Sequence, residues 1–255
     1  KTKSSPAYLD AVGRIKVIRN DATNHCSGTL ISTKPGQSSR TIQTAGHCFG
    51  DTKTLKKFDI KSITWETTTK SGQKIVKDLT IETLNLAADD AVVSFSGKIP
   101  FSTIKPALVL GEEVIYETFG DIRQVIVYND NANIVVAGYS ADNYKGDGGN
   151  TLTYEDNIPI RNFINFSVDY LIYRFKSVVY SGASGGAVLI DTDLSDEDIK
   201  NPYGQMFYGG TMLRLEATGT HLFRESKDRA TLGGEWVNFR SVEIIDTDLI
   251  NKLNK

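Results

Sequence analysis

Short segments in which apolar and polar residues alternate make up most of the chain, and they leave few options for its fold. Strand-like runs occur at residues 12–17, 29–32, 41–44, 60–65, 75–83 and 91–95. A stretch with two prolines, from Gly97 to Pro106, is interpreted as a linker, and a second series of strands begins near Val114. That series includes residues 122–127, 134–139, 170–175, 187–190, 210–213 and 217–221. Many short strands with few helical stretches predict an all-β barrel or sandwich.

The clearest helical pattern lies at the C-terminal end, where Val242, Ile245, Leu249, Ile250 and Leu253 recur at helical spacing. We therefore divide the chain into a β-rich N-terminal half at 1–105, a second β-rich half at 106–240 and a helix at 241–255. With 255 residues, of which 40% are hydrophobic, the chain is long enough to bury a sizeable core.

Charge and cysteine content narrow the possible partners. The net charge of −2 gives no electrostatic reason to expect binding to nucleic acid or to an anionic membrane. No apolar run is long enough to span a bilayer, and the first residues lack the apolar core of a signal peptide. The two cysteines, Cys26 and Cys48, are not a close Cys-x-x-Cys pair, which argues against zinc. From their number alone they could be free thiols or one disulfide.

Residues 181–189 read Ser-Gly-Ala-Ser-Gly-Gly-Ala-Val-Leu, which is typical of a nucleophile on a glycine-rich turn before a buried strand. A serine hydroxyl needs a base to take its proton and N–H donors to stabilise the oxyanion that forms during attack. Glycines on both sides let the backbone bend tightly. Ser184 therefore predicts a histidine and a carboxylate elsewhere in the chain. Taken alone, the same residues fit an ordinary loop equally well.

His47 is one of three histidines and stands at the end of a predicted strand. A lone histidine there is more often structural than catalytic. Here, however, the sequence reads C-S-G-T-L-I-S at residues 26–32 and T-A-G-H-C at residues 44–48. Together these motifs resemble the chymotrypsin-like (trypsin-like) serine peptidase family. The resemblance implies that His47 is the general base and that Cys26 and Cys48 form a disulfide beside it. Such a disulfide would indicate an oxidising compartment.

The carboxylate is expected just before a strand, and residues 87–95, A-A-D-D-A-V-V-S-F, provide two adjacent acids. The family has an alanine two residues after its aspartate. Ala91 stands at that position relative to Asp89, which favours Asp89 over the alternative, Asp90. A buried Asp89 would orient the imidazole of His47. The order His47, Asp89, Ser184 matches the chymotrypsin order, and it makes a mere loop at Ser184 the weaker interpretation.

The resemblance covers most of the chain and implies two six-stranded antiparallel Greek-key β-barrels with a C-terminal helix. His47 and Asp89 would come from the first barrel and Ser184 from the second. The backbone N–H groups of Gly182 and Ser184 would form the oxyanion hole. No cofactor and no metal is implied.

Several positions depart from the best-known members of the family. Ala183 stands where trypsin-like digestive enzymes have the aspartate that accepts a new N-terminus, so that activation switch is not expected. Val178 stands where trypsin has an aspartate, which argues against cleavage after Lys or Arg. His221, in Gly-Thr-His, matches a histidine by which bacterial glutamyl endopeptidases bind acidic side chains. Val179, however, replaces the Thr or Ser that those enzymes also use.

Two specificities therefore remain open. One is cleavage after Glu or Asp, and the other is a small or apolar preference favoured by Val178 and Val179. A buried structural role for His221 also remains open. The backbone of Leu222, Phe223 and Arg224 is expected to pair with the substrate as an extra strand. Arg224 replaces a usual glycine of the pocket wall, so it either adds positive charge or narrows the entrance.

The sequence thus predicts a secreted or periplasmic serine endopeptidase that works as a monomer on protein or peptide substrates. A catalytically weak binding module, such as a toxin, adhesin or scaffold on the same fold, is the alternative. A processing protease with few substrates is a third possibility. The acidic residues 191–198 lack the glycine and distal glutamate of an EF-hand, which favours a solvated loop over a calcium site.

Overall fold

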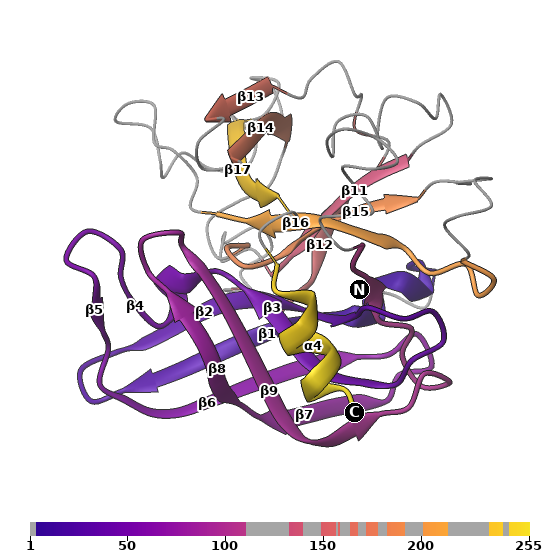
Figure 1. Ribbon diagram of the computed structural model, residues 1–255, viewed down its shortest axis with the longest axis horizontal. Helices are drawn as coiled ribbons and strands as arrows, with labels where there is room; N and C mark the ends of the chain where they lie inside the picture. Colours follow the sequence, from indigo (N-terminus) through magenta and orange to yellow (C-terminus); the bar gives the residue numbers. More distant parts are fainter. Residues whose placement is uncertain are drawn as a thin grey trace.

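The computed structural model describes residues 4–110, 133–139, 149–156, 158, 164–167, 172–177, 183–191, 201–213, 235–241 and 245–255 (Figure 1). Within these ranges, β-strands form one sheet of 15 strands and a separate pair of two short strands. The helical elements described are two short 3-10 helices and one α-helix. The predicted all-β fold with a helix at the C-terminal end is confirmed.

The N-terminal half forms a curled antiparallel sheet, drawn from indigo to magenta in Figure 1. Its strands lie in the order β7-β6-β1-β2-β3-β9-β8, and the separate pair β4-β5 follows a 3-10 helix, η2. The elements are η1 (Ala7–Ala11), β1 (Val12–Arg19), β2 (Thr23–Ser32), β3 (Ser39–Thr44), η2 (Gly46–Cys48), β4 (Gly50–Asp51), β5 (Lys56–Lys57), β6 (Ile60–Thr68), β7 (Lys74–Asp78), β8 (Thr80–Asn85) and β9 (Asp90–Ile99).

Trp65 is the largest fully buried side chain of this half. It lies on β6, where alternate residues point inward as the pleat requires. Its indole Nε1 donates a hydrogen bond of 3.0 Å to the Gly28 carbonyl, and its ring stacks on Phe95 with centroids 6.4 Å apart. A Cβ at Gly13 would lie 2.2 Å from the indole, so a glycine is required there. Trp65 and Phe95 thus lie together in the apolar core of the first half.

The second half is built on the sheet order β12-β11-β15-β16, with β17 joining β16 to β14 and β13. The short strand β10 pairs in parallel with both β2 and β16, and so connects the two halves through backbone hydrogen bonds. The elements are β10 (Ala107–Leu108), β11 (Asn133–Gly138), β12 (Thr153–Glu155), β13 (Ile164–Ser167), β14 (Ile172–Ser177), β15 (Ala187–Asp191), β16 (Phe207–Met212) and β17 (Glu235–Ser241).

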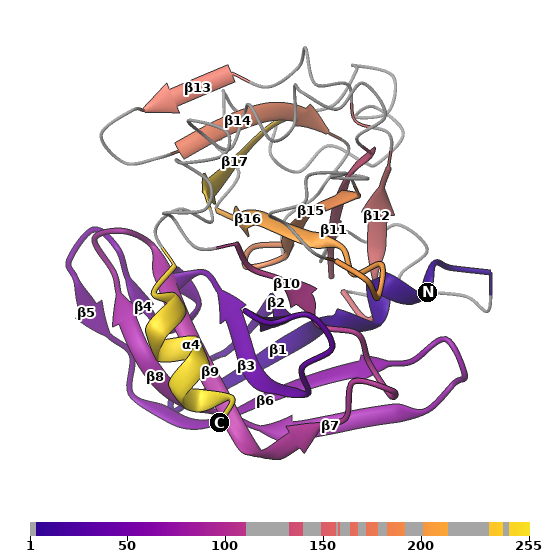
Figure 2. The ribbon, with the colours of Figure 1, turned by 45° about the vertical axis from the view of Figure 1, so that its right-hand side comes forward.

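The C-terminal helix α4 (Thr247–Leu253) lies across the strands of the first half, as both ribbon views show (Figures 1 and 2). The Asp246 carboxylate caps its N-terminus by accepting a 2.9 Å hydrogen bond from the Leu249 N–H. Asn254, which is 2% exposed, follows the helix and accepts hydrogen bonds from the Arg40 N–H at 3.0 Å and the Thr41 hydroxyl at 2.9 Å. No helix among the described residues is long and apolar enough to cross a membrane.

Three details of the predicted elements differ in the structure. The expected strand at 75–83 is interrupted at Leu79, whose N–H donates to the Ile63 carbonyl at 2.9 Å, so that β7 pairs with β6 and β8 pairs with β9. The expected linker from Gly97 begins later, because β9 continues to Ile99 through Gly97 at φ +72°. The helix begins at Thr247, while Val242 lies outside the described residues.

Two buried clusters support the predicted division near residue 105, which stays a prediction. One cluster contains only residues between Ala11 and Ile104. The other is drawn mostly from the second half, and it includes Leu9, Val12 and Ile31 from the first. The two halves therefore share apolar surface where they meet. The expected strands at 114, 122–127 and 217–221 lie outside the described residues.

Candidate active site

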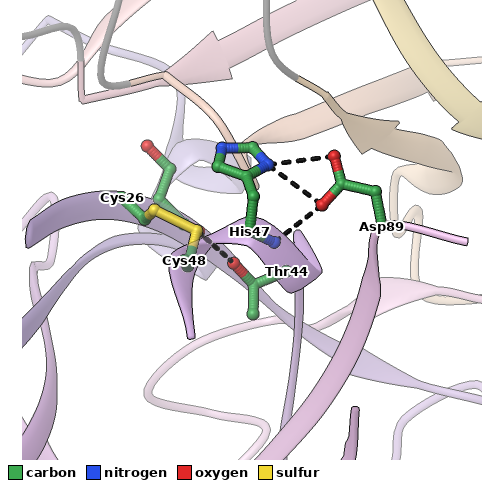
Figure 3. A network of polar contacts seen from close by, with 6 residues as sticks. Cys26, Thr44, His47, Cys48 and Asp89 are labelled. Carbon is green, nitrogen blue, oxygen red and sulfur yellow. Dashed lines mark hydrogen bonds and ion pairs between the residues drawn. A yellow bond between two sulfur atoms is a disulfide. The ribbon is translucent and has the colours of Figure 1, made fainter. Parts of the chain in front are cut away.

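His47 and Asp89 meet at one end of the first half (Figure 3). His47 lies in η2, directly after β3, and Asp89 lies in the turn between β8 and β9. The Nδ1 atom of His47 is 2.9 Å from Oδ2 and 3.0 Å from Oδ1 of Asp89. The backbone N–H of His47 also donates to Oδ1, at 2.7 Å. One carboxylate therefore contacts both the ring and the backbone of His47, and the other ring nitrogen faces away from it (Figure 3).

The backbone of Asp89 has an unusual conformation. Its φ of +54° lies in the left-handed region, which aspartate tolerates better than most residues because its short side chain can bond locally. Asp90, the alternative that the sequence left open, starts β9, and its Oδ1 accepts a 2.5 Å hydrogen bond from Nε2 of Gln43. Of the two adjacent acids, Asp89 is the one that reaches His47. Strained backbone of this kind is common at functional sites.

The predicted disulfide between Cys26 and Cys48 is confirmed, and it ties the middle of β2 to the end of η2. The hydroxyl of Thr44 lies 3.9 Å from Sγ of Cys48 and donates to the Ser27 carbonyl at 2.7 Å. Ligand atoms of Cys26, His47 and Cys48 lie within 4.8 Å of one another, a spacing that a metal ion could use. The disulfide removes both thiolates, which are the forms that bind metal.

Ser184 lies on a tight turn in which the Gly186 N–H donates to the Ala183 carbonyl at 2.8 Å. Gly185, at φ +80°, provides the left-handed residue of that turn. The carbonyl of Ser184 accepts a 2.7 Å hydrogen bond from the N–H of Ser27 on β2. A Cβ at Gly185 would lie 2.2 Å from Oγ1 of Thr44 and 2.3 Å from the Ser27 carbonyl. Only glycine lets the Ser184 turn approach the first half this closely.

Ser27 is a site residue that sequence reasoning missed. It is fully buried, its N–H holds the carbonyl of Ser184, and its hydroxyl accepts a 2.7 Å hydrogen bond from the N–H of Tyr139, at the end of β11. It therefore fixes two segments of the second half against β2. Its only sequence signal is its place directly after Cys26, since a buried serine carries no periodic pattern of its own.

Ser184, His47 and Asp89 line one open pocket with a volume of about 660 Å³. Ser184 contributes from the second half, and the rest of the described lining comes from the first. The hairpin β4–β5 and the start of β2 form the remaining walls, through Thr23, Asn24, His25, Cys26, Cys48, Gly50, Asp51, Thr52, Lys53 and Phe58.

Two ionisable groups of these walls have shifted pKa values. Burial, with the nearby charges of Arg14 and Lys16, lowers the pKa of His25 below its usual range. Hydrogen bonds from the backbone of Thr54 and Lys53 hold the pKa of Asp51 below its ordinary value. At neutral pH, Asp51 is thus ionised and bonded to its own loop.

The remaining predicted site residues lie outside the described residues. They are Gly182 of the oxyanion hole, the pocket residues Val178, Val179, His221, Leu222, Phe223 and Arg224, and most of the acidic stretch 191–198. Ala183 is described and is 2% exposed. A Cβ added at Gly138 would lie 2.9 Å from the Cβ of Ala183, so Ala183 packs tightly against β11.

No protein-family model matches the chain, and no curated protein does. Solved structures do match. A thermostable serine protease, AL20, from an extremophilic microorganism is 13% identical and superposes with a TM-score of 0.56 over 93% of both chains. The protease Anisep from Arthrobacter nicotinovorans is 13% identical, with a TM-score of 0.54 over 93% of this chain and 92% of its own. A Glu endopeptidase in complex with MPD is 14% identical, with a TM-score of 0.56 over 100% of this chain and 94% of its own.

Identities this low establish a shared fold and leave the function to the residues of the site. The matches nevertheless extend over nearly the whole of each chain, and the predicted fold class is confirmed. The chain has the fold of the chymotrypsin-like serine proteases.

Proposed function

We propose that this protein is a serine endopeptidase that hydrolyses peptide bonds through an acyl-enzyme intermediate. The observation that carries the proposal is the pocket in which Ser184, from the second half, lies with His47 and its hydrogen-bonded partner Asp89, from the first. A binding module has no physical need for these three groups in one open pocket. The fold shared with serine proteases gives further support.

In the proposed reaction, Oγ of Ser184 attacks the carbonyl carbon while Nε2 of His47 takes its proton. Asp89 keeps the proton of the neutral ring on Nδ1 and stabilises the imidazolium that forms. The N–H groups of Gly182 and Ser184 bind the oxyanion. The C–N bond then breaks, and His47 gives its proton to the leaving amine. Water, activated by the same base, hydrolyses the acyl ester and regenerates Ser184.

The preferred residue before the scissile bond is proposed to be Glu or Asp, with His221 as its partner. A Glu endopeptidase among the structural matches supports this choice. Val178 and Val179 favour a small or apolar residue as the competing choice. The disulfide supports a secreted or periplasmic location, because such bonds persist in oxidising compartments.

A fluorophosphonate serine probe tests the proposal, with Ser184→Ala as the control. We expect the parent protein to be labelled and the variant to remain unlabelled, since the probe reacts only with an activated serine. Cleavage of a mixed peptide library then reads the specificity. Labelling of both proteins, or of neither when both are folded and oxidised, would contradict the proposal and favour a binding module.

A further inference from the structure

The pocket that contains Ser184 extends far beyond the three candidate catalytic residues. On one side it is walled by the segment around the hairpin β4–β5, from Gly50 to Phe58, and on the other by the start of β2, including Thr23 and His25. The disulfide Cys26–Cys48 lies between these walls. The described part of the pocket thus lies almost entirely on the His47 side of the nucleophile.

This position tells which part of a substrate the pocket receives, if the proposed function is correct. The acyl portion of a cleaved peptide stays on Ser184 and its oxyanion donors, which belong to the second half. The leaving amine must take its proton from His47, so the residues after the scissile bond lie over His47 and continue along the first half. The walls at Gly50–Phe58 and Thr23–His25 therefore face the leaving peptide.

These walls belong to the most basic part of the chain. Between residues 14 and 61 there are nine Lys or Arg residues against three Asp residues, whereas the whole protein has a net charge of −2. Three of the nine, Lys53, Lys56 and Lys57, lie in the hairpin segment itself and are exposed. Of the nine, Lys53 lines the described pocket, where the ionised Asp51 also lies. An excess of positive charge around a cleft attracts negative charge.

Two carboxylates at or near the pocket, those of Asp51 and Asp21, already accept hydrogen bonds from neighbouring residues. The carboxylate of Asp51 accepts hydrogen bonds from the N–H groups of Lys53 at 2.8 Å and Thr54 at 3.1 Å. Asp21 is paired with Arg19 at 2.8 and 2.5 Å, and the Arg19 guanidinium lies 4.0 Å above the ring centroid of Phe58. Lys53 is exposed and also lines the pocket; besides the backbone hydrogen bond from Thr54, its positive charge helps to lower the pKa of the neighbouring Asp51, but its ammonium group is in no salt bridge among the described residues.

We propose that the cleft selects substrates with an acidic side chain within the first three residues after the scissile bond, and that Lys53 is the specificity-determining residue. The hairpin segment holds Lys53 beside the path of the leaving peptide, and Lys56 and Lys57 add to the positive field. This preference is separate from the one predicted before the scissile bond, since it concerns different walls of the site.

A panel of matched peptides tests the inference, with Glu, Gln or Lys placed in turn at each of the three positions after the bond. Because the interaction is an exposed ion pair, we expect kcat/KM for Glu to exceed that for Gln by about two- to five-fold at low salt, and the ratio to approach one at high salt. Lys53→Glu should abolish or invert the ratio. Lys34→Glu makes the same charge change on the exposed β2–β3 turn, away from the pocket, and should leave the ratio unchanged.

The outcomes separate this inference from the proposed function. Equal rates for the Glu and Gln peptides, or a ratio that is the same in Lys53→Glu as in the parent, would overturn the inference alone. Absence of both probe labelling and peptide cleavage in the parent protein would overturn the proposed function as well. The free energy of unfolding of Lys53→Glu in urea, measured beside that of the parent, shows that the variant is folded, so a lost preference cannot be attributed to misfolding.

Discussion

Replacing Asp89 by asparagine tests the candidate site with the least disturbance of the fold. The amide has the same shape as the carboxylate, and asparagine also tolerates the left-handed φ of +54° found here. Its Oδ1 can still accept the 2.7 Å hydrogen bond from the N–H of His47. Its NH₂ group, however, would face Nδ1 of His47, where a hydrogen-bond acceptor now lies at 2.9 Å. The ring must then carry its proton on Nε2, so it can no longer take the proton of Ser184.

The expected loss in kcat is about 10⁴-fold, the size of effect that the same carboxylate-to-amide change causes in a Ser-His-Asp protease. In transition-state free energy this is about 5 kcal/mol. Folding stability should change by only about 1 kcal/mol, because a charge-assisted hydrogen bond becomes a neutral one. Asp89→Ala should be equally inactive but less stable than Asp89→Asn, since it leaves the His47 N–H without its partner.

The assay compares the rate of fluorophosphonate labelling at neutral pH with the free energy of unfolding in urea for the same proteins. Asp90→Asn is the matched control, because Asp90 is the adjacent aspartate and bonds to Gln43 instead of His47. It should label at close to the parent rate. A loss of less than about tenfold in Asp89→Asn, or an equal loss in Asp90→Asn, would refute the assigned role of Asp89.

Four further predictions concern stability. Removing the disulfide with a Cys26→Ser/Cys48→Ser double variant should lower the free energy of unfolding by about 3 kcal/mol, from its sequence separation of 22, and an unchanged urea midpoint would contradict this. Gly185→Ala should abolish probe labelling and destabilise the fold, because its Cβ would lie 2.2 Å from Oγ1 of Thr44. Gly72→Ala, at φ +89° with nothing within 4 Å, should show only the backbone cost of about 1–2 kcal/mol in the same urea assay. Burial raises the pKa of Glu66, but a hydrogen bond from Lys74 and the charge of Arg14 outweigh it and hold this pKa below 4.5. Its ionised form therefore stabilises the fold above that pH, and the stability gap between Glu66→Gln and the parent should close as the pH falls toward 3 in unfolding experiments.

The parts of the candidate site that could be predicted from the sequence are those that short motifs mark. His47 beside Cys48, and Asp89 two residues before Ala91, are fixed by neighbours along the chain, so a local pattern is enough to find them. The Cys26–Cys48 pairing followed from the same motifs, and the structure contains it. The all-β class followed from the alternation of residues in each strand.

Contacts between distant segments could not be predicted in this way. Nothing local marks Ser27 as the residue that holds the carbonyl of Ser184, because that contact depends on how two halves pack. The interruption at Leu79 has the same origin, since its cause is a hydrogen bond to Ile63 on another strand. The hairpin around Lys53 has too few residues for a periodic pattern, and only the folded chain places it along the pocket.

The position of α4 has a consequence for how the protein folds. Asn254, directly after the helix, bonds to Thr41 on β3, and 213 positions along the chain separate the two residues. Contacts over such distances form late, because closing a long loop costs conformational entropy before any contact repays it. The Thr41 hydroxyl and the Arg40 N–H, which donate to Asn254, therefore remain open to water until Asn254 docks. Completion of the first half is thus a late folding event that depends on residues more than 200 positions further along the chain.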